Sequence, residues 1–341
     1  MNAKWLLFIP TLSVAPTLMA ADPASSSITY EIKGRIAASD ALWDYVSVDA
    51  MTRRLYVGRI GGVMAVDLGS QSVAPVLVAS PLVHAVLPLG DTGLVASTNG
   101  AGNTVSIFDG KTGHVVATIP AGREPDALVL EPKSGLLVAA NAESGDLTLI
   151  DVKRLAAVGN IAVGGKPEFL AVDGEGLVYN NIENRSEVAV IDITSRKILH
   201  KIKLSGCREP TGLAFDVPDF LLISVCQNGV VKFINARTYK DVATFTVGKG
   251  PDAAIFDTAR RVAFVPSGGD GTLTVFAVRS ARDITVQQTL HTRLGTRTGA
   301  VDPATGTVYL PSAQLAPPAK PDAWPSVVPG TFAVLVVAPK Q

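Results

Sequence analysis

Residues 121–129, AGREPDALV, carry a pattern that returns along the chain. A Gly, a basic residue, a Pro and then an acid or Thr recur at 164–172 (GGKPEFLAV), 206–215 (GCREPTGLAF) and 248–256 (GKGPDAAIF). An apolar stretch follows each Pro. The Pro restricts the backbone where an extended segment begins, and Gly122 is expected to permit the turn before it. The spacing of these copies indicates a repeat of about 42 residues.

A second marker repeats with the same period. Short alternating stretches end in Asp or Asn, at successive spacings of 42, 42, 41 and 43 residues. The stretches are VMAVD (Asp67), VSIFD (Asp109), LTLID (Asp151), VAVID (Asp192) and VKFIN (Asn235). Two independent markers that share one period indicate a repeat architecture.

Each repeat has the pattern of four short strands. Within residues 126–165, stretches such as DALVLEP, LLVAA and LTLID alternate apolar and polar residues and are separated by Gly, Pro, Asn and Asp. This alternation predicts β-strands, and no long stretch shows the 3.6-residue period of a helix. Four antiparallel strands in every ~40 residues are typical of a WD40-like β-propeller blade.

The number of repeats predicts an all-β, seven-bladed propeller of four-stranded antiparallel blades. The first strands of the blades are expected to start at Asp44, His84, Asp126, Glu168, Thr211, Asp252 and Thr298.

The two ends of the repeat array predict how the ring closes. Residues 28–38 (ITYEIKGRIAA) resemble a fourth strand, and the C-terminal stretch TFAVLVVAP resembles a third. We therefore expect the N-terminal strand to complete the last blade, which removes open strand edges. The propeller then spans residues 28–341, with a Pro-rich loop at 313–330 inside blade seven.

The N-terminus has the pattern of a secretory signal peptide, predicted at residues 1–21. Lys4 supplies the positive end, Trp5 to Met19 form the apolar part, and small residues mark the cleavage region. Residues 22–27 form a short linker. The apolar part is too short to span a bilayer, and no other segment is long and apolar enough. We expect a periplasmic or otherwise secreted monomer without a transmembrane segment.

The second strands resemble those of a known family. LYVGR, LVASTN, VYNNIE and VYLPS, on a ~42-residue repeat in an exported chain, resemble the YVTN-repeat β-propellers of the YncE-like family. GCREPTGLAFD, with a second Cys on the following strand, also looks like a recurring blade of that family. The resemblance covers residue 28 to the end, although no blade spells Tyr-Val-Thr-Asn in full. It implies an exported seven-bladed binding module, not a particular reaction.

The residue that follows the strand-opening Pro is expected at the mouth of the central channel, once per blade. We call these residues the mouth ring: Asp44, His84, Asp126, Glu168, Thr211, Asp252 and Thr298. Converging carboxylates and a His could bind a hard cation, or a cationic or hydroxylated small molecule or protein partner. If a metal is bound, Asp126, Glu168 and Asp252 are its expected ligands.

A structural role for the same residues is the alternative. Bases in the preceding loops could pair with the acids and leave water in the channel, or the acids could cap local turns. These bases are Arg123, Lys166, Arg208, Lys249 and Arg297. A single His such as His84 is more often a hydrogen-bonded structural group than a ligand. His114, His200 and His291 fall near outer strands, with no spacing suited to a metal.

The chain contains two cysteines, Cys207 and Cys226. An even pair in an exported protein predicts one disulfide, and two buried free thiols are the alternative. Cys207 lies in the loop that leads into blade five, and Cys226 ends the second strand at the same rim. Neighbouring strands would bring both near bonding distance.

The opposite face, which we call the far face, is predicted to be basic. It collects fourteen of the 30 Lys and Arg residues: Arg53, Arg54, Lys111, Lys133, Lys153, Arg154, Arg196, Lys197, Arg237, Lys240, Arg260, Arg261, Arg279 and Arg282. Such a face could weakly bind DNA or an anionic membrane surface. A formal net charge of +0 and the absence of an aromatic platform favour ordinary solvated turns instead.

No linear motif of a hydrolase, P-loop or EF-hand occurs in the chain, so we expect no cofactor and assign no catalytic residues. The favoured hypothesis is a non-enzymatic binding or scaffold protein with its ligand site at the mouth ring. The loop that carries Trp324 could cover part of that mouth. A metal-dependent, lactonase-like hydrolase that uses the same carboxylates is the enzymatic alternative.

Overall fold

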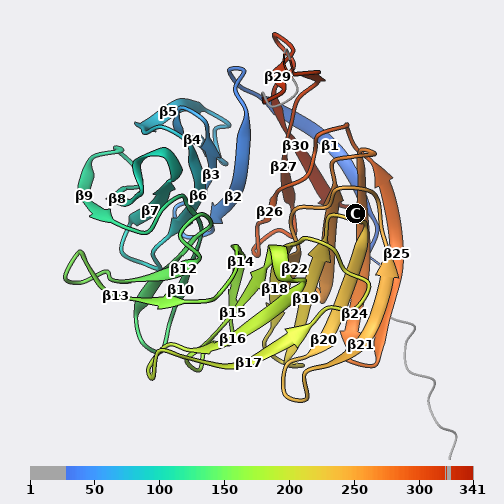
Figure 1. Cartoon of the computed structure of the whole chain (residues 1–341). Coiled ribbons are helices and arrows are strands. Elements are labelled where there is room, and N and C mark those ends of the chain that lie inside the picture. Colours follow the sequence, from blue (N-terminus) through green and yellow to red (C-terminus); the bar gives the residue numbers. More distant parts are fainter. Residues whose placement is uncertain (1–27, 319, 321–323, 341) are drawn as a thin grey trace, which may run out of the picture.

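The computed structural model describes residues 28–318, 320 and 324–340. The predicted signal peptide and linker lie outside these residues. Seven four-stranded antiparallel sheets are arranged in a ring (Figure 1), which confirms the predicted fold class.

The first six blades follow chain order from the inner strand outward. Blade one contains β2 (Trp43–Asp49), β3 (Arg54–Arg59), β4 (Gly62–Asp67) and β5 (Val73–Ala79). Blade two contains β6 (Val83–Pro88), β7 (Leu94–Asn99), β8 (Thr104–Asp109) and β9 (Val115–Pro120). Blade three contains β10 (Pro125–Glu131), β11 (Leu136–Asn141), β12 (Asp146–Asp151) and β13 (Ala156–Ala162).

The next three blades repeat this order. Blade four contains β14 (Pro167–Val172), β15 (Leu177–Ile182), β16 (Glu187–Asp192) and β17 (Lys197–Lys203). Blade five contains β18 (Pro210–Asp216), β19 (Leu221–Cys226), β20 (Val230–Asn235) and β21 (Lys240–Thr246). Blade six contains β22 (Ile255–Asp257), β23 (Val262–Ser267), β24 (Thr272–Ser280) and β25 (Asp283–His291).

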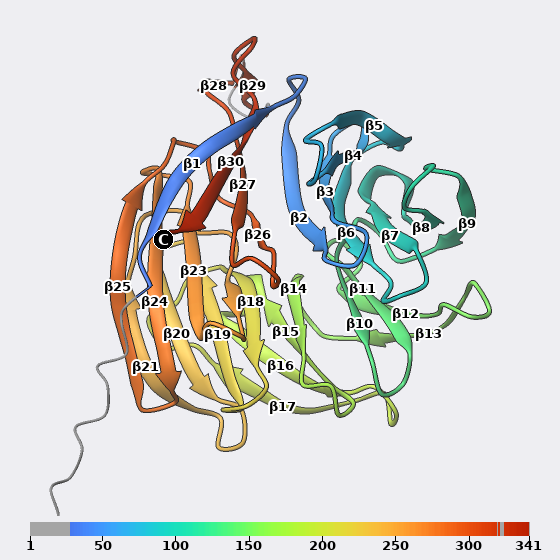
Figure 2. The same cartoon turned by 180° about the vertical axis from the view of Figure 1, so that it is seen from behind.

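Blade seven joins the two ends of the chain. Its order is β26 (Ala300–Val301), β27 (Val308–Ser312), β30 (Ala333–Pro339) and β1 (Tyr30–Ala37). Strands β1 and β30 are antiparallel, with Tyr30 opposite Pro339 and Ala37 opposite Ala333. Figure 2 shows β1 alongside β30, so the N-terminal strand completes the last blade as predicted.

The Pro-rich segment 313–330 contains a feature that its composition did not predict. Strands β28 (Leu315–Ala316) and β29 (Ser326–Val327) pair into a short ribbon, which projects beyond the ring in Figures 1 and 2. The described helices are the 3₁₀ turns η1 (Gly100–Gly102) and η2 (Glu183–Arg185). None of the helices in the described residues is long and apolar enough to cross a membrane.

Burial falls from the channel to the rim of each blade. In blade three, most side chains of β11 and β12 are buried, whereas only one residue of the outer strand β13 is buried. Both faces of an inner sheet contact neighbouring blades, so these strands are apolar along most of their length. The outer strands face solvent along most of their length.

The Asp and Asn residues of the second marker have a local structural role. Asp67, Asp109 and Asp151 accept hydrogen bonds from the backbone N–H groups two and three residues ahead. Asp192 and Asn235 do the same. These side chains cap the turns that lead to the fourth strands, which explains why the marker recurs with the blades.

A side chain from blade six holds the N-terminal strand. The Gln288 amide accepts a hydrogen bond from the Tyr30 N–H at 2.8 Å and donates one to the Tyr30 carbonyl at 2.9 Å. Its neighbour Gln287 donates to the carbonyl of Ile28. The Gln288 side chain therefore extends the backbone hydrogen bonding between two blades.

Gln288→Ala should lower the free energy of unfolding by about 1–2 kcal/mol, because it leaves two backbone groups of Tyr30 without partners. Urea denaturation measures this change. Thr289→Ala, at an exposed site on the same strand, is the matched control and should have little effect. Equal effects of the two substitutions would contradict this role for Gln288.

Candidate functional site

A backbone irregularity at the start of each inner strand positions the mouth ring. In blade three, Pro125 pairs with Asn141 and Leu128 pairs with Ala139, so two residues face a single partner residue. The same shift occurs in blades one, two, four and five. Such a bulge takes a side chain out of the regular alternation and redirects it. The bulge carries Asp126 and the corresponding residues of these other blades, so their side chains can point toward the mouth.

The turn before Asp126 differs from the sequence-based prediction. Gly122 is not among the residues with positive φ, so the expectation that it permits the turn by its backbone freedom is wrong. A Cβ at this position would lie 2.3 Å from Ser144 Oγ, so Gly is needed for space. The left-handed residue is Glu124, with φ of 53°. Leu82 and Glu209 take the same conformation at the corresponding position in their blades.

Blades one to three bring three members of the mouth ring into contact. His84 Nδ1 lies 2.6 Å from Asp44 Oδ2 and 3.6 Å from Asp126 Oδ1. His84 is buried, and its Nε2 faces the backbone of Gly100, where an added Cβ would lie 2.7 Å away. The imidazole thus presents only its Nδ1 side to the two carboxylates.

Arg297 joins the acids of blades six and one. Its Nε donates to Asp252 Oδ2 at 2.8 Å, and its Nη2 lies 3.8 Å from Asp44 Oδ1. The guanidinium also donates to the Trp43 carbonyl at 3.1 Å. The sequence-based alternative in which a base from a preceding loop pairs with the acids therefore holds for Arg297.

The other bases of the preceding loops do not pair with the mouth ring. Lys166 forms an ion pair with Glu183, and Arg123 lies 3.8 Å from Glu143. Among the described residues, Arg208 and Lys249 form no ion pair. The ring acids of blades three and four are therefore left without a basic partner of this kind.

A tyrosine reaches across the channel beneath the acids. Tyr45 starts from blade one, and its hydroxyl donates to Glu168 Oε1 of blade four at 3.1 Å. The Tyr45 ring packs edge-on against Phe169, with centroids 4.9 Å apart. Tyr45 belongs to a buried apolar cluster, and Phe169 packs against that cluster. These contacts link blades one and four at the mouth, and we call the space that the acids of the mouth ring surround the cup.

Thr211 and Thr298 serve as tethers between blades. The Thr211 hydroxyl donates to the Pro251 carbonyl at 2.9 Å, and the Thr298 hydroxyl donates to the Asp44 carbonyl at 2.7 Å. The structure therefore divides the predicted ring into two groups. The ionisable members Asp44, His84, Asp126, Glu168 and Asp252 carry the charge, whereas the two Thr hydroxyls are occupied by backbone groups.

Burial changes the proton affinity of these acids. Burial, reinforced by the charges of Asp44 and Asp252, raises the pKa of Asp126 well above its usual range. Burial, with the charge of Asp126, likewise raises the pKa of Glu168 well above its usual range. For Asp252, burial raises the pKa while Arg297 opposes the rise. Unpaired buried carboxylates favour their protonated form because ionisation in a poorly solvated place is unfavourable.

Burial and a neighbouring charge act against each other on the pKa of His84. Burial acts to lower the pKa of His84, but the hydrogen bond and the charge of Asp44 outweigh it, so the pKa is raised. A protonated His84 and Arg297 offset part of the negative charge of the cup. The two cations lie close to the carboxylates of Asp44, Asp126 and Asp252, whereas neither pairs with Glu168.

The atoms best placed to hold a metal ion are not the trio expected from sequence. Ligand atoms of Asp44, His84 and Asp126 all lie within 4.8 Å of one another. Of the expected trio Asp126, Glu168 and Asp252, only Asp126 belongs to this group. Asp252 is paired with Arg297, and Glu168 accepts from Tyr45. A mixed carboxylate and imidazole set is compatible with several divalent cations.

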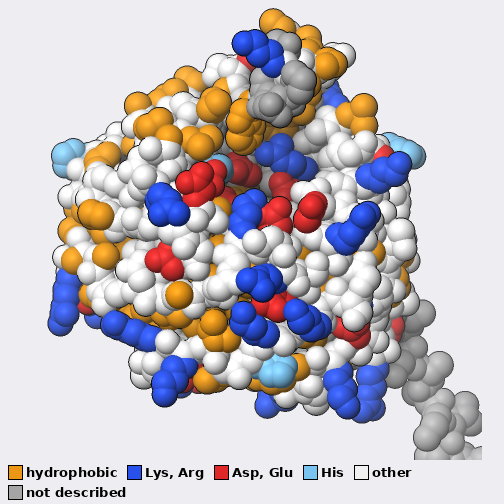
Figure 3. Space-filling view, in the orientation of Figure 1, with side chains coloured by type: hydrophobic (Ala, Val, Ile, Leu, Met, Phe, Trp, Pro, Cys, Tyr) orange, Lys and Arg blue, Asp and Glu red, His pale blue; other side chains and the backbone are white. Residues whose placement is uncertain are grey.

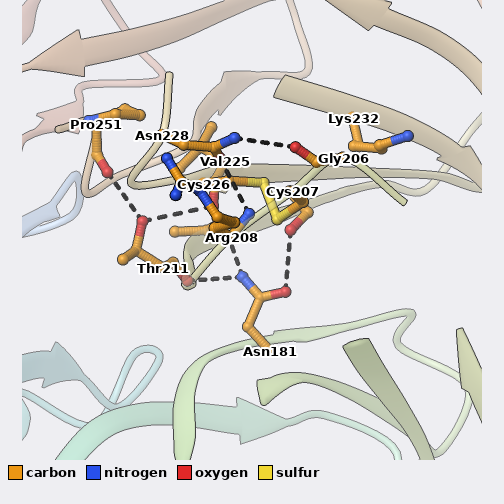
Figure 4. Close-up of a disulfide and its surroundings, with 12 residues drawn as sticks. Asn181, Gly206, Cys207, Arg208, Thr211, Val225, Cys226, Asn228, Lys232 and Pro251 are labelled. Atoms are coloured by element: carbon orange, nitrogen blue, oxygen red, sulfur yellow. Dashed lines mark hydrogen bonds between the residues drawn. A yellow bond between two sulfur atoms is a disulfide. The ribbon is translucent and has the colours of Figure 1, made fainter. Parts of the chain in front are cut away.

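Cys207 and Cys226 form the predicted disulfide (Figure 4), with Cα atoms 5.5 Å apart. Both residues are buried at the rim of blade five. Asn228 donates to the Gly206 carbonyl at 2.9 Å beside the bridge. Asn181 of blade four donates to the Thr211 carbonyl at 2.7 Å, so the bridged segment is also tied to the neighbouring blade.

Many bases of the far face are engaged in contacts between blades. Arg53 pairs with Asp302 of blade seven, and Arg261 pairs with Asp216 of blade five. These aspartates belong to a second set of buried acids, at the far ends of the inner strands, that the sequence reading missed: Asp49, Glu131, Asp173, Asp216, Asp257 and Asp302. Their regular place at the end of the first strand in six of the seven blades was the available signal. Because of this pairing, fewer Lys and Arg side chains of the far face are available to a polyanion than their number in the sequence suggests.

Comparison with known proteins identifies the fold. No family model matches the chain, and no curated protein matches it. A chain in the crystal structure of the mitotic checkpoint complex is similar, with 16% identity, a TM-score of 0.73, and coverage of 98% of this chain and 99% of that chain. A chain of Kuenenia stuttgartiensis hydrazine synthase is also similar, with 15% identity, a TM-score of 0.69, and coverage of 85% and 96%.

These similarities and the geometry define a seven-bladed β-propeller with a cup of carboxylates at one end of its channel. At such identities the likeness concerns the fold alone. A propeller is found in proteins of very different kinds, so function has to be argued from the cup.

Proposed function

We propose that this protein is a non-enzymatic binding module whose cup receives a positively charged group of a small molecule or protein partner. The observation that carries the proposal is the state of Asp126. Asp126 as a whole residue is 8% exposed, and its side chain accepts no hydrogen bond from the described residues. A cationic group placed there would stabilise the ionised form of this carboxylate, which burial alone disfavours.

Glu168 and Asp44 support the same proposal. Glu168 is 9% exposed, and its described hydrogen-bond partner is the neutral hydroxyl of Tyr45. Asp44 is the least buried of the four acids and lies toward the opening. Figure 3 shows acidic side chains gathered in a hollow near the middle of this face. A cation could therefore enter from solvent and contact several carboxylates.

We also propose that the chain is an exported, YVTN-type propeller of the YncE-like kind and works in the periplasm. The signal-like N-terminus and the second strands LYVGR, LVASTN, VYNNIE and VYLPS support this assignment. The disulfide supports an oxidising compartment.

A metal-dependent, lactonase-like hydrolase is the second candidate. The close grouping of Asp44, His84 and Asp126 favours it. In that case the three residues would hold the ion, which would act as a Lewis acid on a bound carbonyl. Binding of polyanions through the far face has weaker support, because Arg53, Arg261 and other bases there are already paired.

The first test compares cationic and neutral probes of the same size. Nα-acetyl-lysine amide and Nα-acetyl-arginine amide should bind, whereas Nα-acetyl-norleucine amide should not, as measured by ligand-observed NMR and titration calorimetry. Asp126→Asn with Glu168→Gln should weaken the binding of the lysine probe at least about tenfold, because both anionic partners are removed. Asp91→Asn, an exposed acid outside the mouth, is the matched control.

Equal binding of the norleucine probe, or undiminished binding by the double variant, would contradict the proposal. Elemental analysis and native mass spectrometry of protein purified from its own compartment address the second candidate. A stoichiometric metal that the double variant loses would favour the hydrolase. DNA retention that is unchanged in the double variant would be a separate property of the far face.

A further inference from the structure

An apolar slot adjoins the cup on the side of blades one and two. The slot is shallow, with a cavity volume of about 20 Å³, and it is lined by residues that include Leu42, Ile60, Leu82 and Trp324. Two of these apolar side chains face solvent, since Ile60 is 47% and Trp324 is 62% exposed. Exposed large apolar side chains gathered at one place often mark a binding site.

The slot and the cup share walls. Asp44 and His84 line the slot, and the same two side chains are joined at 2.6 Å at the edge of the cup. One ligand can therefore place a charged group against the carboxylates and an adjoining apolar group against Leu82 and Trp324. Neither part would need a change in the backbone.

Apolar surface continues on the other side of the β28–β29 ribbon. A second hollow there is lined by Leu294 and Leu315, and Leu294 is 62% exposed. Figures 1 and 2 show the ribbon standing out from the ring. A single small amine in the cup would be too small to cover both hollows, whereas an extended peptide segment could lie along this surface.

We infer that the mouth recognises a segment of a protein partner in which a Lys or Arg is directly followed by a large apolar residue. The basic side chain enters the cup, and the apolar side chain packs over the shallow slot against the exposed side chains of Ile60 and Trp324. This inference rests on the proposed function and adds the class of partner. The buried Asp126 carboxylate accepts no hydrogen bond from the described residues, so charge complementarity selects a basic residue of the partner. Tyr45 bonds to Glu168 across the channel and stops the partner's basic side chain from passing further down.

The test uses three short peptides that differ at one position each. Ac-Gly-Lys-Leu-Gly-NH₂ should bind the wild-type protein about tenfold more tightly than Ac-Gly-Lys-Ser-Gly-NH₂, because contact with Ile60 and Trp324 removes apolar surface of the Leu side chain from water. The peptide with norleucine in place of Lys should bind the least. Hexylammonium, a small amine with an apolar tail, tests whether a peptide is needed.

Two variants isolate the slot from the cup. Trp324→Ala and Ile60→Ala should each remove most of the preference for Leu over Ser while the affinity for the Lys-Ser peptide is unchanged. Both side chains are largely exposed, so folding should be preserved, and Val286→Ala on an outer strand is the matched control. Loss of the preference in the Val286 variant would overturn the inference.

The outcomes separate the inference from the proposed function. Equal binding of the Lys-Leu and Lys-Ser peptides overturns the inference and leaves the cationic cup intact. Hexylammonium binding as tightly as the Lys-Leu peptide overturns the assignment of a protein partner. Failure of both lysine peptides and of the lysine amide overturns the proposed function itself.

Discussion

Asp126→Asn combined with Glu168→Gln should stabilise the fold at neutral to alkaline pH while it weakens binding of a cationic probe at least about tenfold. We expect the free energy of unfolding to rise by about 0.5–2 kcal/mol near pH 8, in the range of substitutions that relieve strain at functional sites. The amides keep the size of the acids, but they carry no charge that burial could destabilise.

The sign of the pH dependence follows from the proton affinities. Burial raises the pKa of Asp126 and of Glu168, so the folded protein holds protons that the unfolded chain releases above about pH 4. Their stabilising contribution is complete below about pH 4 and is lost as the pH rises through the folded-state pKa values. The pKa of His84 is also raised, so its contribution is complete below about pH 6.5 and is lost above.

Urea denaturation of wild type and double variant across this range provides the measurement. The difference in stability should be small near pH 4 and should widen toward pH 8. Asp91→Asn serves again as the control and should show no such widening. A double variant that is less stable than wild type at about pH 8 would mean that the two acids are structural partners and not a binding site.

Removal of the disulfide should give the largest loss of stability. Cys207→Ala with Cys226→Ala should lower the free energy of unfolding by about 3 kcal/mol, because the unfolded chain regains the freedom of a loop of this length. Urea denaturation of the oxidised protein, compared with the variant, tests this value.

The reduced wild-type protein is the internal control for this prediction. Treatment with a thiol reductant should bring wild type close to the double Ala variant and leave the variant unchanged. Binding of the lysine amide should persist in the variant, since neither Cys contacts the carboxylates of the cup. A loss of stability below about 1 kcal/mol would contradict a bracing role for the bridge.

Local signals in the sequence were sufficient for the architecture. The Asp residues of the second marker cap turns within a few residues of themselves, and the strand-opening Pro lies next to the strand that it starts. Such contacts repeat with the blade, so their period predicted seven blades. The N-terminal strand was also predictable because an unpaired fourth strand and a blade lacking one are complementary.

The membership of the mouth ring was predictable for the same reason, but the role of each member was not. The repeat predicted one such residue per blade, and the structure brings Asp44, His84 and Asp126 together. The sequence could not show that Thr211 and Thr298 donate to backbone carbonyls, or that Arg297 selects Asp252 at a separation of 45 residues. These choices depend on distances between blades.

The sequence by itself determined the blade repeat, the closing strand and the cysteine pair, because each arises from contacts within a blade or between its nearest neighbours. Only the tertiary structure decided which side chains of different blades meet at the mouth, since Tyr45 reaches Glu168 across 123 residues of sequence. The tertiary structure also decided which carboxylates of the mouth ring form no ion pair with a base of the preceding loops. Burial and charge at the mouth come from all seven blades together, and no single repeat contains them.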